Sequence, residues 1–195
     1  VLVIHENRGL NPHIKDVARR AALAGYNALA LDFLSPLGGT PANEDEARAL
    51  FSKLDAAQSV ANGRAALAYL KALPNSNGKV GTVGFCWGGA MANQLAVQAP
   101  DLNAAVSFYG MAPDTALVPQ IKAHVQLHYA GLDERINASR EAYEKALKAA
   151  GIDFESYLYE GKQHAFHNDV NVARYDQASA ELAWKRTLDL FKRTL

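Results

Sequence analysis

Residues 79–99 read KVGTVGFCWGGAMANQLAVQA, and they join two patterns of different periodicity. KVGTVGF is a short apolar run typical of a buried strand, and AMANQLAVQA is a helical pattern. Between them, GFCWGG has the form of a nucleophile elbow, a sharp strand-to-helix turn, with Cys86 in the place of serine. The flanking glycines are needed because a Cβ atom would clash with backbone close to the nucleophile. The turn also places the sulfur at a helix N-terminus, which favours a thiolate.

A second interpretation of Cys86 is a small buried cysteine in a glycine-rich turn, because free cysteines are commonly buried. Cys86 is the only cysteine of the chain, so an internal disulfide is excluded. The elbow motif alone does not separate a reactive thiol from a packed one. The rest of the sequence has to decide between them.

Short β-rich runs alternate with longer helical patterns along the whole chain, which indicates βαβ units. We expect strands at Val1–Glu6, Asn27–Asp32, Lys79–Phe85, Ala104–Tyr109, His124–Ala130 and Phe154–Tyr159. The chain length of 195 residues suits one domain, residues 1–195. The predicted fold class is therefore α/β, with a mostly parallel central sheet and helices on both faces.

Capping residues predict where the helices begin and end. Asn11 with Pro12 at the first helical position, and Asn43 with Glu46 three residues later, are N-terminal signals. Gly151 is typical of a helix C-terminus. The expected helices are residues 12–23, 44–73 before Pro74, 87–100, 137–150 and 174–193.

Two further residues follow predicted strands in the order that the elbow fold requires, acid first and then histidine. HVQLHYA is followed by Gly131-Leu132-Asp133, and FESYLYE by a loop that contains His164. The carboxyl ends of parallel strands meet at one edge of a sheet, so Cys86, Asp133 and His164 are expected to lie together. His164 would accept the thiol proton, and Asp133 would orient the imidazole. Taken alone, Asp133 is an ordinary turn residue. The expected placement of Cys86, Asp133 and His164 at one edge of the sheet favours a catalytic role.

Charge and hydropathy narrow the possible partners. Lys plus Arg and Asp plus Glu are equal at 20 each, which gives no basic field for nucleic acid or for a membrane surface. No apolar run approaches the roughly 20 residues of a spanning helix, and no leader pattern is present, so we expect a cytoplasmic protein. The six histidines and Gly38-Gly39 lack the spacing of a metal or nucleotide site, so no metal and no cofactor are predicted. The expected partner is a small molecule.

At this point the sequence resembles a known family. GFCWGG, the opening HENRGLNPHIKDVARRAALAGY, the AGLDE turn and GKQHAFHN are similar to the dienelactone hydrolase (carboxymethylenebutenolidase) family of the α/β-hydrolase superfamily. The likeness spans essentially the whole chain. It implies an α/β-hydrolase fold of eight strands, whereas six are predicted, so the first two N-terminal strands are expected to be missing. The abrupt start at Val1 matches this expectation.

The resemblance also implies roles that spacing does not give. The family's glutamate at the position of Glu6 contacts the nucleophile and helps to remove its proton. The oxyanion hole would be formed by the backbone N–H groups of Asn7 and Trp87. Without the resemblance, Glu6 would be a solvated or ion-paired acid at a strand end.

The resemblance leaves the substrate open. Well-known members hold a substrate carboxylate with arginines, one of them soon after the catalytic histidine, but residues 165–169 contain none. The place of a second, helix-borne arginine falls within residues 44–48 and is taken by another residue, although Arg48 could reach the site. A less anionic ester or lactone is therefore expected. Phe51, Tyr109 and Phe166, together with Trp87, are candidates for an aromatic pocket, although each could equally be a core residue.

Three functions remain after this reasoning. The first is hydrolysis of an ester or lactone through a thioester on Cys86. The second is a non-catalytic member of the fold that binds a ligand or senses oxidants through its thiol, and the third is acyl transfer to an alcohol or amine. Cys86, Asp133 and His164 together favour the first. The sequence leaves the oligomeric state open.

Overall fold

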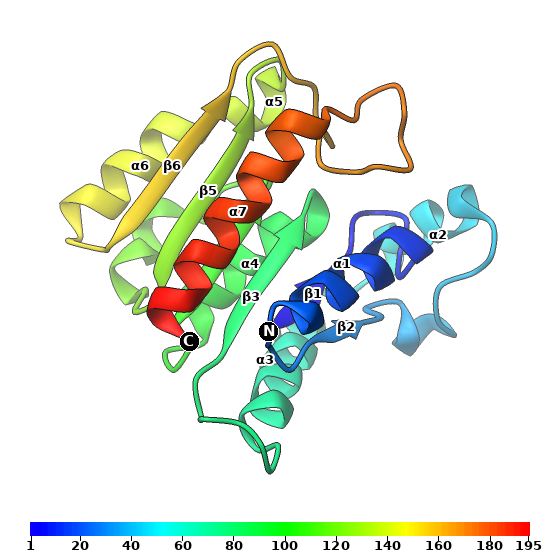
Figure 1. The fold of residues 1–195 in the computed structure, drawn as a ribbon, viewed down its shortest axis with the longest axis horizontal. Helices are drawn as coiled ribbons and strands as arrows, with labels where there is room; N and C mark the ends of the chain where they lie inside the picture. Colours follow the sequence, from blue (N-terminus) through cyan, green and yellow to red (C-terminus); the bar gives the residue numbers. More distant parts are fainter.

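The computed structural model describes residues 1–195, and its centre is one sheet of six parallel strands (Figure 1). The strands are β1 Leu2–Ile4, β2 Leu29–Leu31, β3 Gly81–Phe85, β4 Ala104–Phe108, β5 His124–Ala130 and β6 Phe154–Tyr159. All six predicted strands are present and every pairing is parallel, which confirms the expected sheet. The spatial order is β2-β1-β3-β4-β5-β6. The order reverses between β1 and β3, and strand ends leave a crevice at such a point.

Helices cover both faces of the sheet, as expected. Figure 1 shows α1 (Pro12–Leu23) and α7 (Gln177–Thr194) across one face, with α3 (Ala56–Lys71), α4 (Trp87–Gln98) and α6 (Arg140–Ala149) behind the other. Each face has its own apolar core: Val3, Val83 and Val106 pack with α1 and α7, while Leu2, Ile4 and Val125 pack with the helices of the opposite face. No helix combines the length and the apolar character that crossing a membrane would need.

The single helix predicted for residues 44–73 is wrong, because the chain breaks it into three parts. These are α2 (Glu44–Leu50), a 3₁₀ turn η2 (Phe51–Lys53) and α3. Leu54 is extended, and the Asp55 carboxylate accepts a hydrogen bond from Gln58 N–H at 2.7 Å, so a new N-cap starts α3. Asn43 caps α2 by accepting from the N–H groups of residues 45 and 46. The break lets α2 stay at the carboxyl edge of the sheet while α3 runs along its face.

Two other helix starts also differ from the prediction. The helix predicted for 137–150 is α6 and starts later, at Arg140, because Asn137 is the last residue of α5 (Glu134–Asn137) and its side chain donates to Ala130 O at 2.8 Å instead of capping a helix. The last helix begins at Gln177, not at Arg174, because Asp176 accepts from Ser179 N–H and caps α7. Arg174 therefore belongs to the loop before α7. The remaining 3₁₀ segments are η1 Ser35–Leu37 and η3 Thr115–Gln120.

Candidate active site

Cys86 occupies a strained turn between β3 and α4. Its φ is 56° and its ψ is −113°, in the region of positive φ that non-glycine residues rarely adopt. The glycines on either side are needed for close approach: a Cβ on Gly84 would lie 1.8 Å from Gly88 O, and one on Gly88 would lie 2.4 Å from Ile4 O. The predicted elbow geometry is thus present. The thiol stands at the first turn of α4 and is partly exposed.

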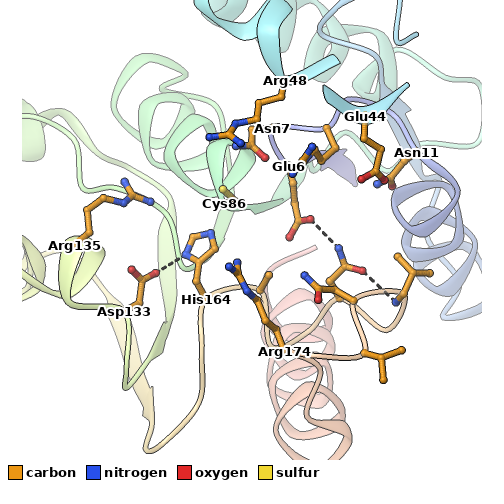
Figure 2. Close-up of a pocket in the computed structure, with 16 residues that line it drawn as sticks. Glu6, Asn7, Asn11, Glu44, Arg48, Cys86, Asp133, Arg135, His164 and Arg174 are labelled. Carbon is orange, nitrogen blue, oxygen red and sulfur yellow. Dashed lines mark hydrogen bonds and ion pairs between the residues drawn. The ribbon is translucent and has the colours of Figure 1, made fainter. Parts of the chain in front are cut away.

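Asp133 and His164 reach Cys86 from the ends of β5 and β6. Figure 2 shows the His164 ring between Asp133 and Cys86, and His164 Nδ1 is hydrogen-bonded to Asp133 Oδ2. Burial lowers the pKa of His164, but the hydrogen bonds to Asp133 and to Cys86 outweigh burial and raise this pKa to about 9. Burial raises the pKa of Asp133, and the contact with His164 lowers it overall. The proximity predicted for these three residues is confirmed.

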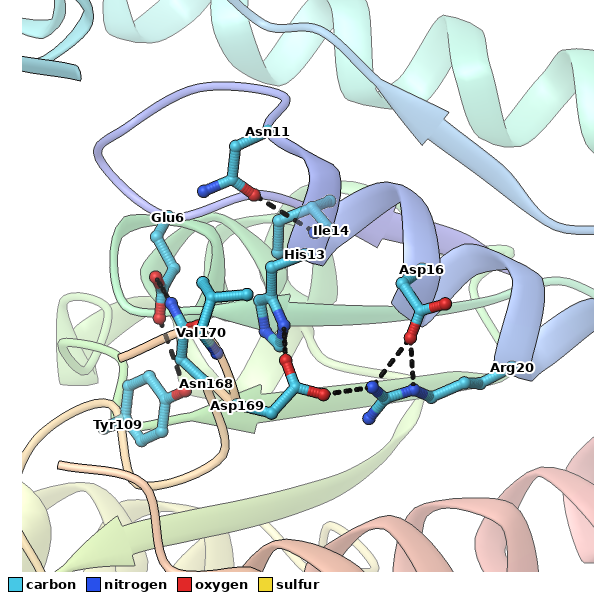
Figure 3. Close-up of polar contacts among 10 residues, drawn as sticks. All are labelled: Glu6, Asn11, His13, Ile14, Asp16, Arg20, Tyr109, Asn168, Asp169 and Val170. Carbon is cyan, nitrogen blue, oxygen red and sulfur yellow. Dashed lines mark hydrogen bonds and ion pairs between the residues drawn. The ribbon is translucent and has the colours of Figure 1, made fainter. Parts of the chain in front are cut away.

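Glu6 follows β1 and enters the same site. The residue is only 6% exposed, yet it has no cationic partner. Its carboxylate accepts hydrogen bonds from Asn168 Nδ2 at 2.8 Å and from the Tyr109 hydroxyl at 3.4 Å (Figure 3). Burial raises the pKa of Tyr109 well above its ordinary value, and the nearby charges of Glu6 and Cys86 raise it further, so the hydroxyl remains a donor. Glu6 is therefore a buried carboxylate in the same cavity as the thiol.

Asn7 and Trp87, the predicted oxyanion residues, lie on opposite sides of the crevice between β1 and β3. The Asn7 N–H donates to no acceptor of the chain, and Trp87 opens α4, where backbone N–H groups lack helical partners. His5 lies two residues before Asn7, and its ring stacks on Trp87 with ring centroids 5.7 Å apart. His5 also accepts from Phe33 N–H at 3.0 Å. The strand end that presents Asn7 is therefore firmly held.

The candidate active site opens into a cavity of about 690 Å³ whose wall is mainly polar. Arg48, predicted as a substrate contact, lines this cavity (Figure 2). Arg135 and Arg174 also line it and were missed from the sequence. Arg135 could have been found, because it lies two residues after Asp133 in GLDER. Arg174 was hidden because it was assigned to a helix. The full lining is Glu6, Asn7, Arg8, Asn11, Glu44, Arg48, Cys86, Asp133, Arg135, His164, Ala165, Asn168, Val170, Asn171, Val172 and Arg174.

The expected aromatic wall is wrong. Phe51, Tyr109 and Phe166 do not line the cavity. Tyr109 and Phe166 are fully buried and pack against each other, and Phe51 packs on Trp87 with ring centroids 5.1 Å apart. Large rings bury the most apolar area in a core, so these three rings pack against other rings instead of lining the cavity. Arginines and asparagines are left to face the cavity.

Comparisons with known sequences give one consistent family. A model described as "Dienelactone hydrolase family" matches residues 1–195. A protein of Methylorubrum extorquens named "Putative carboxymethylenebutenolidase" is 33% identical over 207 residues, covering 98% of this chain and 71% of that protein. A protein of the same name from Escherichia coli O157:H7 is 34% identical over 98% of this chain and 76% of its own length.

Solved structures agree with these matches. The crystal structure of a Klebsiella pneumoniae protein named "Putative Dienelactone Hydrolase" superposes with a TM-score of 0.88 at 29% identity, covering 98% of this chain and 85% of that chain. A dienelactone hydrolase-like promiscuous phosphotriesterase from metagenomic libraries superposes with a TM-score of 0.84 at 25% identity, covering 99% of this chain and 85% of that chain.

Proposed function

The chain belongs to the dienelactone hydrolase family, and on that premise we propose that it cleaves ester or lactone bonds with Cys86 as the nucleophile. The observation that supports this most is the lone thiol in a strained turn, next to a His164–Asp133 hydrogen bond. A pKa of about 9 lets His164 retain, as imidazolium, the proton that it takes from the thiol. An acceptor of this kind beside a thiol is the arrangement that nucleophilic catalysis requires.

The first half of the proposed reaction acylates Cys86. His164 accepts the thiol proton, and Glu6 helps to remove that proton. Asp133 stabilises the imidazolium that forms. The thiolate adds to the substrate carbonyl carbon, and the carbonyl oxygen becomes an oxyanion that the N–H groups of Asn7 and Trp87 stabilise. When the C–O bond to the leaving group breaks, His164 gives its proton to the departing alkoxide. A thioester remains on Cys86.

The second half of the reaction regenerates the thiol. A water molecule gives a proton to His164 and attacks the thioester carbonyl carbon. The C–S bond breaks, the carboxylic acid leaves, and Cys86 recovers its proton from His164. This chemistry needs Cys86 as a free thiol, a state that a reducing compartment such as the cytoplasm maintains.

We assign the substrate a negative charge, in contrast to the expectation from residues 165–169. Arg8 is paired with Asp45 at 3.0 Å, but Arg48, Arg135 and Arg174 form no ion pair with the chain. Each of the three is exposed and lines the cavity that holds Cys86. Guanidinium groups bind carboxylates in a planar, two-point geometry. An ester or lactone that carries a carboxylate fits this cavity best.

The test follows the acyl group. The protein is incubated with p-nitrophenyl esters and small enol lactones, and turnover and intact mass are measured for the wild type and for Cys86→Ser and Cys86→Ala. We expect turnover and a transient adduct of the acyl mass on Cys86 in the wild type, and loss of that adduct in both variants. Unchanged turnover in Cys86→Ala would exclude the mechanism.

A second variant separates hydrolysis from thiol sensing. His164→Ala should abolish esterase turnover and change the rate at which iodoacetamide alkylates Cys86. If a folded wild-type protein gives no turnover and His164→Ala leaves the alkylation rate unchanged, the non-catalytic thiol function is favoured instead.

A further inference from the structure

We propose that Asn168 is a positioning residue that fixes the orientation of the Glu6 carboxylate within the cavity that also holds Cys86. This inference rests on the proposed function, because it concerns how Glu6 assists Cys86. Asn168 Nδ2 donates to Glu6 Oε2 at 2.8 Å, and each residue is 6% exposed. The contact joins the end of β1 to the loop after β6, which are 162 residues apart. No motif of the sequence pointed to it.

The Asn168 amide can face Glu6 in only one way. Its Oδ1 accepts from Val170 N–H at 3.2 Å, so its Nδ2 is left to donate. A flipped amide would place an oxygen against the carboxylate and leave the Val170 N–H without its acceptor. The backbone is fixed too, since Asn168 N–H donates to Ala165 O at 3.0 Å. The donor is therefore already oriented before any substrate arrives.

The donors to Glu6 are both uncharged. Asn168 on one carboxylate oxygen and Tyr109 on the other supply hydrogen bonds without a formal positive charge. A cation at this place would also fix the carboxylate, but it would neutralise the charge that lets Glu6 attract a proton. A neutral amide orients the carboxylate and leaves that charge intact. This is the function that we assign to Asn168.

The next residue anchors Asn168 to the body of the molecule. Asp169 accepts from His13 Nδ1 at 2.8 Å and forms an ion pair with Arg20, both on α1 (Figure 3). Arg20 is also held by Asp16 on the same helix at 2.7 Å. Because α1 directly follows the segment that carries Glu6, the two partners of the Asn168–Glu6 contact are fixed to one helix. The distance between them is therefore set by the fold.

The test exchanges donor and acceptor. Asn168→Asp keeps the shape and the acceptor for Val170 N–H, but it places a second carboxylate against Glu6. We expect kcat to fall by about tenfold or more, with KM changed by less than about threefold, because one hydrogen bond to a charged group is lost. We also expect a lower Tm.

In Glu6→Gln/Asn168→Asp, the amide of residue 6 donates to the new carboxylate, so Tm should recover while kcat should not.

Asn75→Asp is the matched control, because it removes an amide donor from an exposed pair with Asn27, remote from the cavity. It should leave kcat unchanged. Wild-type kcat in Asn168→Asp, or a double variant no more stable than Asn168→Asp, would overturn the proposal.

Alkylation of Cys86 by iodoacetamide gives a readout that needs no substrate. Asn168→Asp and Glu6→Gln should shift its rate in the same direction, and Asn75→Asp should not shift it. If the wild type hydrolyses no ester, the proposed function fails, but the alkylation rates and the Tm recovery still decide whether Asn168 positions Glu6. Equal alkylation rates in all variants would contradict the positioning role.

Discussion

His164 is the residue at which the surroundings change the chemistry most. It is partly buried, and burial by itself would keep the imidazole neutral at physiological pH. The Asp133 carboxylate on Nδ1 and the Cys86 sulfur nearby reverse this and raise the pKa to about 9. Because the ordinary value is 6.5, the folded protein holds a proton on His164 that the unfolded chain releases between these two pH values.

This difference predicts how stability depends on pH. A pKa raised by folding contributes stability that is complete below about pH 6.5 and is lost as the pH rises through 9. For His164 the contribution is on the order of 3 kcal/mol at most. The difference in unfolding free energy between wild type and His164→Gln should therefore shrink from pH 6.5 to 9, as measured by urea unfolding.

His124→Gln is the control for this measurement. Burial lowers the pKa of His124, so the contribution of His124 to the unfolding free energy changes below pH 6.5 and stays constant between pH 6.5 and 9. If the difference in unfolding free energy between wild type and His164→Gln also stays constant between pH 6.5 and 9, His164 is not protonated in the folded state.

The loop between β6 and α7 is the element that completes the site. It carries His164, Asn168 and Arg174 into the cavity, and it also exposes Val170 and Val172 at the rim. The loop contains no helix or strand. Its position depends on Asp169, which joins it to α1 through His13 and Arg20.

Asp169→Asn should therefore loosen the loop. We expect a loss of about 1–3 kcal/mol in unfolding free energy, because a charged acceptor of a buried histidine and of an arginine is removed. Cleavage between residues 165 and 175 in limited proteolysis should become faster. The matched control is Asp16→Asn, which removes the other, half-exposed partner of Arg20 on the same helix. That pair contributes only about 0.3–0.5 kcal/mol, so equal effects of the two variants would refute the anchoring role of Asp169.

The same elements show what the sequence could predict. All six strands and the elbow at Cys86 were predictable, because a buried parallel strand and a glycine-flanked turn depend on local residue patterns. The helix break at Asp55 was missed because the helical periodicity of the sequence continues through residue 55, where the Asp55 side chain caps a new helix. The Asn168–Glu6 contact depends on tertiary packing alone. Only the folded chain determines which of its many polar residues face the cavity.

The whole molecule is neutral, but its charges are not evenly placed. Lys plus Arg and Asp plus Glu number 20 each. Four arginines line the cavity against three carboxylates, and Arg48, Arg135 and Arg174 form no ion pair, so the entrance offers a local positive field to an incoming ligand. Salt screens such a field over roughly 10 Å at 0.1 M ionic strength.

Steering by this field predicts a salt effect that depends on substrate charge. For p-nitrophenyl hydrogen succinate, kcat/KM should fall several-fold as salt rises from about 0.02 to 0.5 M, whereas p-nitrophenyl butyrate should be insensitive. Arg174→Gln should lower kcat/KM for the succinate about tenfold and weaken its salt dependence. Arg64→Gln, on the exposed side of α3 and away from the cavity, is the control. An equal salt response for both esters would contradict an anionic substrate.

The candidate active site draws its parts from nearly the full length of the chain. Glu6 is contributed by the beginning, Cys86 by the middle, and His164 and Asn168 by the final quarter, so a fragment that ends before β6 lacks the imidazole that we propose as the main proton acceptor for the thiol. On the ribosome, β1 emerges before the loop that follows β6. Under the proposed mechanism, a nascent or stalled chain that lacks β6 therefore carries a cysteine without its activating histidine. Under the proposed mechanism, Cys86 becomes able to attack an ester only after the loop that carries His164 has folded into place.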